Sequence, residues 1–458
     1  MKTDKPPSRS LGSFLFGAAR SVHDRSTFHN LSLIAFFAWV GLGADGLSSS
    51  CYGPPESFLA LGKHTYLAVF VALATGLTIF IISASYSQII ELFPSGGGGY
   101  LVASKLLTPR LGAVAGCALL VDYVLTITVS IASGADAMFS FLPLEWQQYK
   151  LSVAVGVMFV LTLMNLRGVR ESVAPLVPIF IIFVLTHAVA IVYAIATHVP
   201  EMGRLASSTA ADVRATTAEI GLGGMLLIVL HSYGMGAGTY TGIEAVSNGL
   251  PILREPRVQT GKRTMSYMWI SLAVLVMGLV TSYLVYQVRF EEGKTLNAVL
   301  MEKVTGGWNA GWAQGFIWVT LLSEAALLFI AAQTGFLGGP RVLASMALDR
   351  WFPTRLSMLS DRLVTQNGVL MISAAALITL LATRGSVGYL VVLYSINVFI
   401  TFVLSQSGMV RHWWTHRATV RDWRRRLGIN GVGLLLSALI LVWMVILKFN
   451  EGGWSRWW

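Results

Sequence analysis

The chain consists of long apolar stretches separated by short polar connections. Apolar windows long enough to cross a bilayer, for which about 20 residues are needed, recur along the whole sequence. They centre on residues 31–62, 65–92, 111–142, 150–165, 173–197, 220–250, 266–288, 312–339, 368–383, 386–409 and 430–449. This pattern predicts an all-α polytopic membrane protein with eleven spans. The composition agrees, because 55% of the 458 residues are hydrophobic and only 12% are charged, against roughly 25% charged residues in a soluble domain.

The basic residues lie mainly in every second connection. Of the 33 Lys and Arg residues, 23 fall in residues 1–30 and in the even-numbered connections, and ten fall elsewhere. Because cytoplasmic connections carry an excess of Lys and Arg, we expect a cytoplasmic N-terminal tail at 1–30 and a multi-pass protein of the cell membrane. This topology accounts for the net charge of +11. We interpret the run Arg424–Arg426 as an anchor beside anionic lipid, and we expect the bilayer, not nucleic acid, as a partner.

Two spans contain residues that interrupt a membrane helix. The first span carries glycines, serines and two prolines between Gly41 and Glu56, and the sixth carries four glycines between Gly234 and Glu244. Glycine costs about 1 kcal/mol per helical site and proline more, so both segments should unwind near the bilayer centre. Small residues that merely permit close helix packing are the alternative, but packing does not explain a carboxylate in each segment.

Matching interruptions in two halves of a chain are typical of transporters built from inverted repeats, with the substrate at the repeat interface. We therefore expect two halves of five spans each. The predicted organisation is a first transmembrane repeat at 31–197, an external loop at 198–219, a second repeat at 220–409, and a basic cytoplasmic loop with an eleventh span at 410–458.

Acidic residues inside the spans need a partner or a function, because each costs about 2.5–3.5 kcal/mol at the centre of a membrane helix. Asp45 and Glu244 lie in the two interrupted segments, where backbone carbonyls and the hydroxyls of Ser48, Ser49 and Thr241 can join them as oxygen ligands. Such a set of ligands suits a cation.

The third span carries a polar flank. Asp122 and Thr126 are four residues apart, and Tyr123 and Thr126 are three apart, so the three side chains share one side of a helix. The alternative for Asp122 is a buried carboxylate that caps a neighbouring helix.

Other buried polar residues are interpreted as satisfied core groups. Asp136 and Glu324 are flanked by small residues, and a role as gates is the alternative for both. A single histidine on an apolar face, such as His187 or His231, is more often packed in the core than a proton relay.

No pattern for a cofactor or an enzyme is present in the sequence. Cys51 and Cys117 lie in apolar segments without metal-ligand or disulfide spacing, and we expect both to pack in the core. The glycines at 96–99 are not followed by the Lys and Ser/Thr of a phosphate-binding loop, so we interpret them as a hinge between the second and third spans. We expect a protein that is not an enzyme and has no cofactor.

Several motifs resemble those of the amino acid-polyamine-organocation (APC) superfamily and, within it, the KimA-type potassium transporters, which are related to the KUP family. The resemblance covers residues 31–454, and its motifs are GADGLSSSCYGP at 43–54, FPSGGGGY at 93–100, VDYVLT at 121–126, NLRGVRES at 165–172 and YTGIEAVSNG at 240–249. It implies a LeuT-like fold with a 5+5 inverted repeat and broken first and sixth helices. It also implies a role in potassium binding or proton coupling for Asp45, Tyr52, Asp122, Tyr123, Thr126, Thr241 and Glu244.

By the same resemblance, potassium is expected at Asp45, Asp122, Thr241 and Glu244, and potassium and protons are the transported species. Family members have twelve spans and a cytoplasmic extension, whereas this sequence ends at Trp458, about where a twelfth span would begin. We therefore expect the twelfth span and the extension to be missing. The resemblance leaves a homodimer open.

The chemistry of the first break agrees with a cation. An aspartate there would repel the carboxylate of an amino acid, whereas carbonyls and carboxylates can replace the hydration of potassium. Because burial disfavours the charged form of a carboxyl group, one of these acids can exchange a proton during transport. We hypothesise proton-coupled potassium uptake by alternating access. The alternatives are a proton-coupled amino acid or amine permease of the same superfamily and a transport-inactive sensor or assembly subunit.

Overall fold

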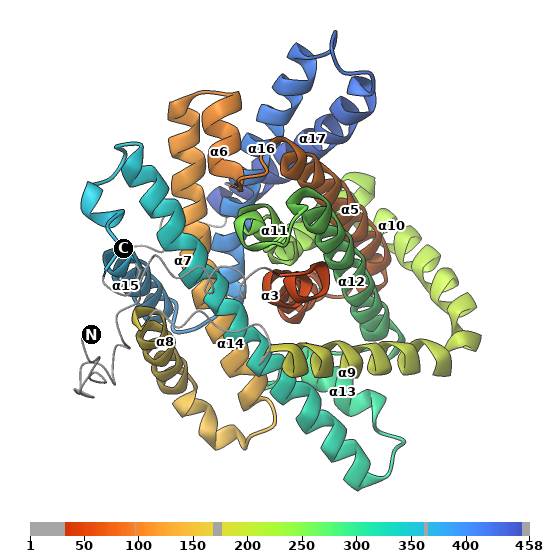
Figure 1. Ribbon diagram of the computed structural model, residues 1–458. Helices are drawn as coiled ribbons and strands as arrows, with labels where there is room; N and C mark the ends of the chain where they lie inside the picture. Colours follow the sequence, from red (N-terminus) through yellow and green to blue (C-terminus); the bar gives the residue numbers. More distant parts are fainter. Residues whose placement is uncertain (1–32, 97, 168–175, 361–364, 451–458) are drawn as a thin grey trace, which may run out of the picture.

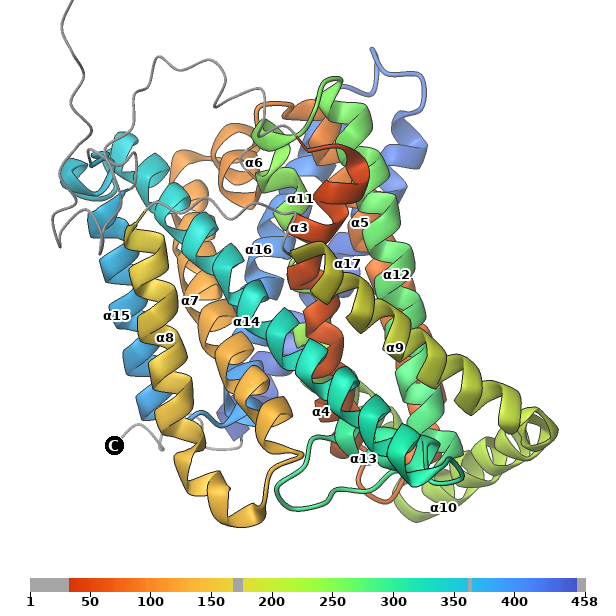
Figure 2. The ribbon, with the colours of Figure 1, turned by 60° about the horizontal axis from the view of Figure 1, so that its bottom comes forward.

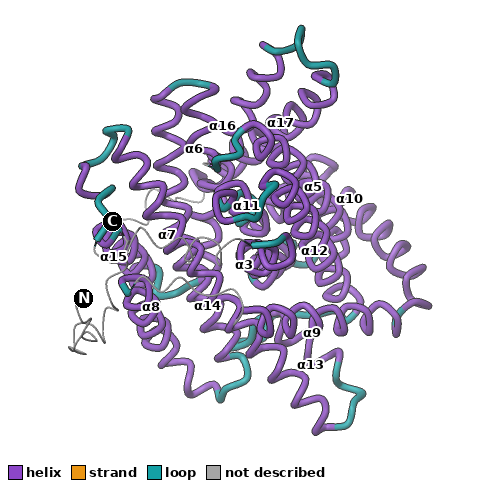
Figure 3. Tube along the Cα trace, viewed as in Figure 1, coloured by secondary structure: helices purple, strands orange, loops and turns teal. Residues whose placement is uncertain are grey.

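The structure, a computed structural model, describes residues 33–96, 98–167, 176–360 and 365–450. Helices form nearly all of this part of the chain and are joined by short connections (Figure 3). The main helices of the first half are α3 (Ala35–Ser48), α4 (Gly53–Ala60), α5 (Ala68–Leu92), α6 (Gly98–Leu106), α7 (Pro109–Phe139), α8 (Lys150–Leu166) and α9 (Leu176–Thr197). Those of the second half are α10 (Met202–Met235), α11 (Ala245–Asn248), α12 (Arg257–Val285), α13 (Leu296–Val304), α14 (Ala310–Leu348), α15 (Gln366–Ala382), α16 (Val387–Thr415) and α17 (Trp423–Asn450).

Each predicted span corresponds to a helix or to an interrupted helix. Among the described residues, nine helices are long and apolar enough to cross a membrane. The two remaining spans fall short of that length, because α3 and α4 are separated by an interruption and α15 has 17 residues. The predicted all-α, multi-pass membrane fold is confirmed.

The two interrupted helices lie at the centre of the bundle. α3 and α11 are surrounded by α5 and α12 on one side and by α7 and α14 on the other (Figure 1). A short parallel bridge ties their ends together: Leu33 N–H donates to Ile252 O and Arg254 N–H donates to Leu33 O, both over 2.9 Å. α4 and α13 lie toward one end of the bundle, which the charge pattern predicts to be external, and α6 and α11 lie toward the opposite end (Figure 2).

The segment expected as an external loop, 198–219, is largely helical. A 3-10 turn at Val199–Glu201 leads into α10, which runs to Met235 and is kinked at Gly221, where the backbone has φ 75° and ψ 166°. The alanine-rich sequence of this segment supports a helix. It is held against the first half of the chain, because Lys63 pairs with Glu219 over 2.5 Å.

The glycines expected to act as a hinge also serve a close contact. Gly98 begins α6 with φ 44°, and a Cβ atom on it would lie 2.0 Å from the side-chain oxygen of Asn248 at the end of α11. The missing side chain therefore lets α6 dock on the second interrupted helix. Gly97 lies outside the described residues.

Candidate functional site

The first interruption begins later than the glycines alone predict. α3 continues to Ser48, a 3-10 turn covers Ser49–Cys51, and α4 starts at Gly53 with the two prolines in its first turn. Because proline has no N–H group, it is tolerated at a helix start and not in a helix interior. Because α3 extends to Ser48, Asp45 lies in its last turn, beside the unwound residues and not among them.

The second interruption follows the expectation more closely. α10 ends at Met235, a 3-10 turn covers Gly236–Tyr240, and Thr241 is extended, with φ −70° and ψ 155°. Glu244 is the N-terminal cap of the short helix α11. Its side chain makes no capping hydrogen bond to α11, so the carboxylate is not used to close this helix.

The two interruptions touch each other through backbone atoms. Gly242 has φ 78°, and a Cβ atom there would lie 2.6 Å from the Gly46 nitrogen. A Cβ atom on Gly53 would lie 2.0 Å from the hydroxyl oxygen of Thr239. Glycine is required at both positions because any side chain would separate the two broken helices.

Hydroxyl groups at this contact give their hydrogens to backbone carbonyls. Ser48 Oγ donates to Asp45 O over 2.8 Å, and Thr241 Oγ1 donates to Gly238 O over 2.8 Å. Tyr52 Oη and Thr241 Oγ1 are 3.3 Å apart. Since the Thr241 hydrogen is already used, Tyr52 is the donor in this pair. The hydroxyl oxygens at the interruptions keep lone pairs for a further ligand, which must then be a cation or a hydrogen donor.

Three carboxyl groups are buried around this contact. Asp45 is 4% exposed, Asp122 on α7 is 2% exposed and Glu244 is 5% exposed. Asp122 interacts electrostatically with both other groups, and one oxygen atom of each of the three has no hydrogen-bond partner among the described residues. If Asp122 only capped a neighbouring helix, its Oδ1 atom would still lack a hydrogen-bond partner. Buried unpaired carboxylates are costly, so the cluster needs a proton or a cation.

The two remaining predicted residues on α7 differ in their position. Thr126 is buried and hydrogen-bonds with the Tyr394 hydroxyl of α16 over 2.6 Å. Tyr123 accepts a hydrogen bond from Asn248 Nδ2 over 3.0 Å, and its ring packs against Gly338 of α14. Tyr123 therefore joins α7 to α11 and α14, whereas Thr126 faces α16.

Two polar residues near the carboxyl groups were not found from the sequence. Tyr394 is fully buried and interacts electrostatically with Asp122, Tyr52 and Asp45. The Thr334 hydroxyl of α14 lies within hydrogen-bonding reach of Asp45. Tyr394 lies in an apolar span without a nearby charge, and Thr334 is an uncharged residue beside Gly335 in a span that carries several glycines. Only the tertiary structure shows that both lie near the carboxyl groups.

A cavity of about 270 Å³ reaches the first interruption from the end of the bundle predicted to be external. Its lining includes Tyr52 and Cys51 at the interruption, and Glu56, Asp136 and Lys150 farther out. Asp136 pairs with Lys150 over 2.7 Å. The cavity gives small polar solutes a route to Tyr52.

The described residues contain no group of three or more His, Cys, Asp or Glu side chains arranged to hold a metal ion. The oxygens that do lie at the interruptions are hydroxyl and carbonyl oxygens beside carboxyl groups. Both cysteines are free; Cys51 is buried as expected, whereas Cys117 is exposed on α7, contrary to the expectation that it packs in the core.

Known membrane transporters are similar to this chain. The chain is 30% identical over 414 residues to the potassium transporter KimA of Bacillus subtilis (strain 168), an alignment that covers 89% of this chain and 66% of that protein. Two structures of the Eremococcus coleocola manganese transporter, one in complex with an aromatic bis-isothiourea substituted compound and one of a mutant, are each 15% identical, cover 98% of both chains and have TM-scores of 0.48 and 0.49. A family model described as amino acid permease matches residues 31–458. The chain belongs to the amino acid permease family.

Proposed function

We propose that this protein is a secondary transporter that takes up potassium together with protons by alternating access. The observation that carries the proposal is the cluster of Asp45, Asp122 and Glu244, buried where the two interrupted helices meet. The hydroxyl oxygens beside it have lone pairs available because their hydrogens point to backbone carbonyls. A cation would neutralise the acidic cluster and accept these lone pairs.

The relative KimA supports potassium as the cation. That protein is described as a potassium transporter, and the chain spans 66% of its length. The matching family model is described as amino acid permease. An amino acid or amine is therefore the second candidate substrate. The acidic cluster disfavours an amino acid, because the substrate carboxylate would meet Asp45 in the last turn of α3.

Coupling to protons supplies the driving force in this proposal. The proton and the cation must then be held on different groups, because a proton on the carboxylates that hold the cation would weaken cation binding. A proton and a cation that cross together leave the cluster with the same charge before and after the cycle. A pH gradient of one unit then supports an accumulation of about tenfold at zero membrane potential.

Uptake by the purified protein in liposomes tests the proposal. Rubidium-86 accumulation driven by an inward proton gradient is the expected result. Accumulation of labelled amino acids without rubidium would favour the permease, and binding without flux would favour a transport-inactive sensor.

Substitutions in the cluster test the site independently. We expect Asp45→Asn and Glu244→Gln each to abolish growth on low potassium in a bacterium that lacks its own uptake systems. Glu302→Gln, on α13 and paired with Lys294 over 2.6 Å, is the matched control and should grow normally. Normal growth of either cluster variant, at normal membrane abundance, would contradict the site.

A further inference from the structure

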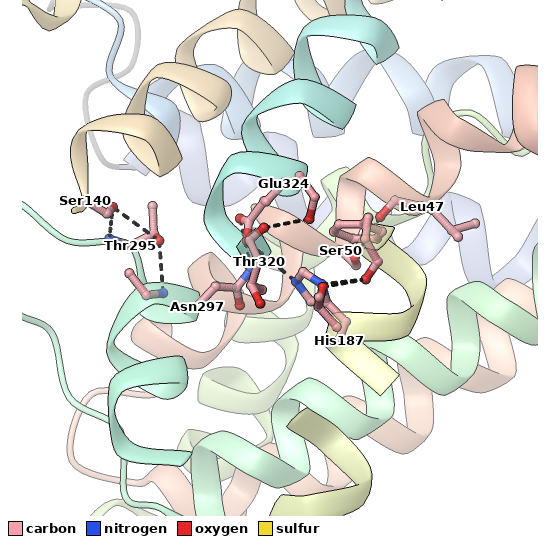
Figure 4. Close-up of polar contacts among 12 residues, drawn as sticks. Leu47, Ser50, Ser140, His187, Thr295, Asn297, Thr320 and Glu324 are labelled. Atoms are coloured by element: carbon pink, nitrogen blue, oxygen red, sulfur yellow. Dashed lines mark hydrogen bonds and ion pairs between the residues drawn. The ribbon is translucent and has the colours of Figure 1, made fainter. Parts of the chain in front are cut away.

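A buried acid and a buried base face each other outside the acidic cluster. His187 of α9 is 0% exposed and Glu324 of α14 is 1% exposed, and His187 Nε2 lies 3.6 Å from Glu324 Oε2. Neither atom has a hydrogen-bond partner among the described residues. Figure 4 shows the two side chains pointing toward each other from neighbouring helices, with Asn297 beside them.

The hydrogen bonds around the pair fix the number of protons it can hold. His187 Nδ1 lies 2.9 Å from Phe183 O; a carbonyl only accepts, so Nδ1 carries a hydrogen. Asn297 Nδ2 donates to Glu324 Oε1 over 3.1 Å, while Asn297 Oδ1 accepts from the Tyr283 hydroxyl. The atoms left over are His187 Nε2 and Glu324 Oε2, which have one proton between them when the pair as a whole is neutral.

Loss of that proton is costly at this position. It would leave a carboxylate opposite the lone pair of a neutral imidazole, both out of contact with solvent, and an unpaired buried charge is strongly destabilising. The proton therefore holds α9 and α14 together, and its departure weakens the contact between them.

The pair is connected to the first interruption and to the outer cavity. The Cys51 thiol, in the 3-10 turn between α3 and α4, interacts electrostatically with Glu324. Cys51 also lines the cavity of about 270 Å³, together with Thr295 and Leu296, which precede Asn297. A proton from solvent in this cavity thus has a short route to Glu324. The titratable groups that face Glu324 are Cys51 on the interrupted helix, Tyr283 on α12 and His187 on α9.

We propose that the His187–Glu324 pair is a proton-binding site of the transport cycle, separate from the acidic cluster. The inference rests on the function proposed above and assigns the residues that exchange the proton. In the loading step a hydronium ion gives its proton to the pair and leaves as water. In the release step the pair returns the same proton to water on the other side. Between these steps, the protonated pair holds α9 against α14.

A test that needs no potassium examines the pair alone. Infrared difference spectra of the purified protein across a pH titration should contain a carboxyl band that is absent in Glu324→Gln and has a shifted midpoint in His187→Gln. Glu302→Gln and His231→Gln are the matched controls and should leave the band unchanged. A band that persists in Glu324→Gln would overturn the inference.

A flux experiment then connects the pair to transport. With the internal pH one unit higher and a permeant anion present, the wild type should accumulate rubidium about tenfold. Glu324→Gln should retain rubidium–potassium exchange but show no accumulation. Loss of both activities in a folded variant, or proton-driven accumulation at the wild-type level, would overturn the inference.

The charge-swapped double variant covers the case in which the single variants fold poorly. His187→Glu with Glu324→His restores one acid, one base and one shared proton, so accumulation should return. A folded double variant without accumulation would contradict the proposal. If the wild type carries no rubidium at all but the infrared band behaves as expected, the potassium function is wrong and the proton site stands.

Discussion

Replacement of Gly242 by alanine tests the contact between the two interrupted helices. A Cβ atom at this position would lie 2.6 Å from the Gly46 nitrogen and 3.0 Å from the Asp45 carbonyl carbon, whereas ordinary contacts begin at 3.4 Å. These neighbours are backbone atoms and have no rotamer to change. The two interruptions must therefore separate by about 0.8 Å, the difference between 3.4 and 2.6 Å.

The backbone conformation adds a second cost, which a control variant isolates. Gly242 has φ 78°, a region that costs other residues on the order of 1–3 kcal/mol. Gly221, at the kink of α10, has φ 75° and no heavy atom within 4 Å of a Cβ position. Gly221→Ala thus also places a side chain at positive φ, but without the clash.

The expected result is a large loss of transport in Gly242→Ala alone. Displacement of ligands by about 1 Å reduces the rate of a positioned reaction by about 100-fold, and we expect a decrease of that order in rubidium uptake. Gly221→Ala should lower the melting temperature in detergent but keep most of its uptake. Wild-type uptake by Gly242→Ala would refute the close contact as the basis of the site.

Two further substitutions follow from the surroundings of the site. Tyr394→Phe removes the hydrogen bond to Thr126, which measures 2.6 Å. Since a hydrogen bond contributes about 0.5–1.5 kcal/mol, the KM for rubidium uptake should rise by about 2- to 12-fold. An unchanged KM would place Tyr394 outside the site. Lys150→Met removes the partner of Asp136 in the outer cavity and leaves the lining with more negative charge. The KM for rubidium uptake should therefore fall by about 2- to 5-fold at low ionic strength. The effect should vanish in high salt because exposed charges are screened. A rise in KM would contradict the cavity as the cation entrance.

The sequence predicts the spans well because the signal for a membrane helix is local. About twenty consecutive apolar residues need no tertiary partner to be recognised, and each predicted window corresponds to a described helix or broken helix. The glycines and prolines located both interruptions, but not the register of the first. α3 remains helical through Gly41, Gly43 and Gly46 because tertiary packing overrides the low helix propensity of glycine.

The side-chain network is less accessible to prediction from the sequence. Asp45 and Glu244 are conspicuous because each is a charge beside glycines in an apolar span. The sequence alone predicts His187 and Glu324 as separate core residues, because their pairing depends on how α9 packs on α14. Tyr394 has no local signal at all. Residues far apart in the sequence become a site only through packing, which a single sequence does not reveal.

Anomalous diffraction from rubidium in crystals of this protein tests the central claim most directly. The account predicts a peak between the two interruptions, within bonding distance of oxygen atoms from Asp45 and Glu244, and the loss of this peak in Asp45→Asn. A peak elsewhere in the bundle, or an unchanged peak in Asp45→Asn, would contradict the acidic cluster as the cation site.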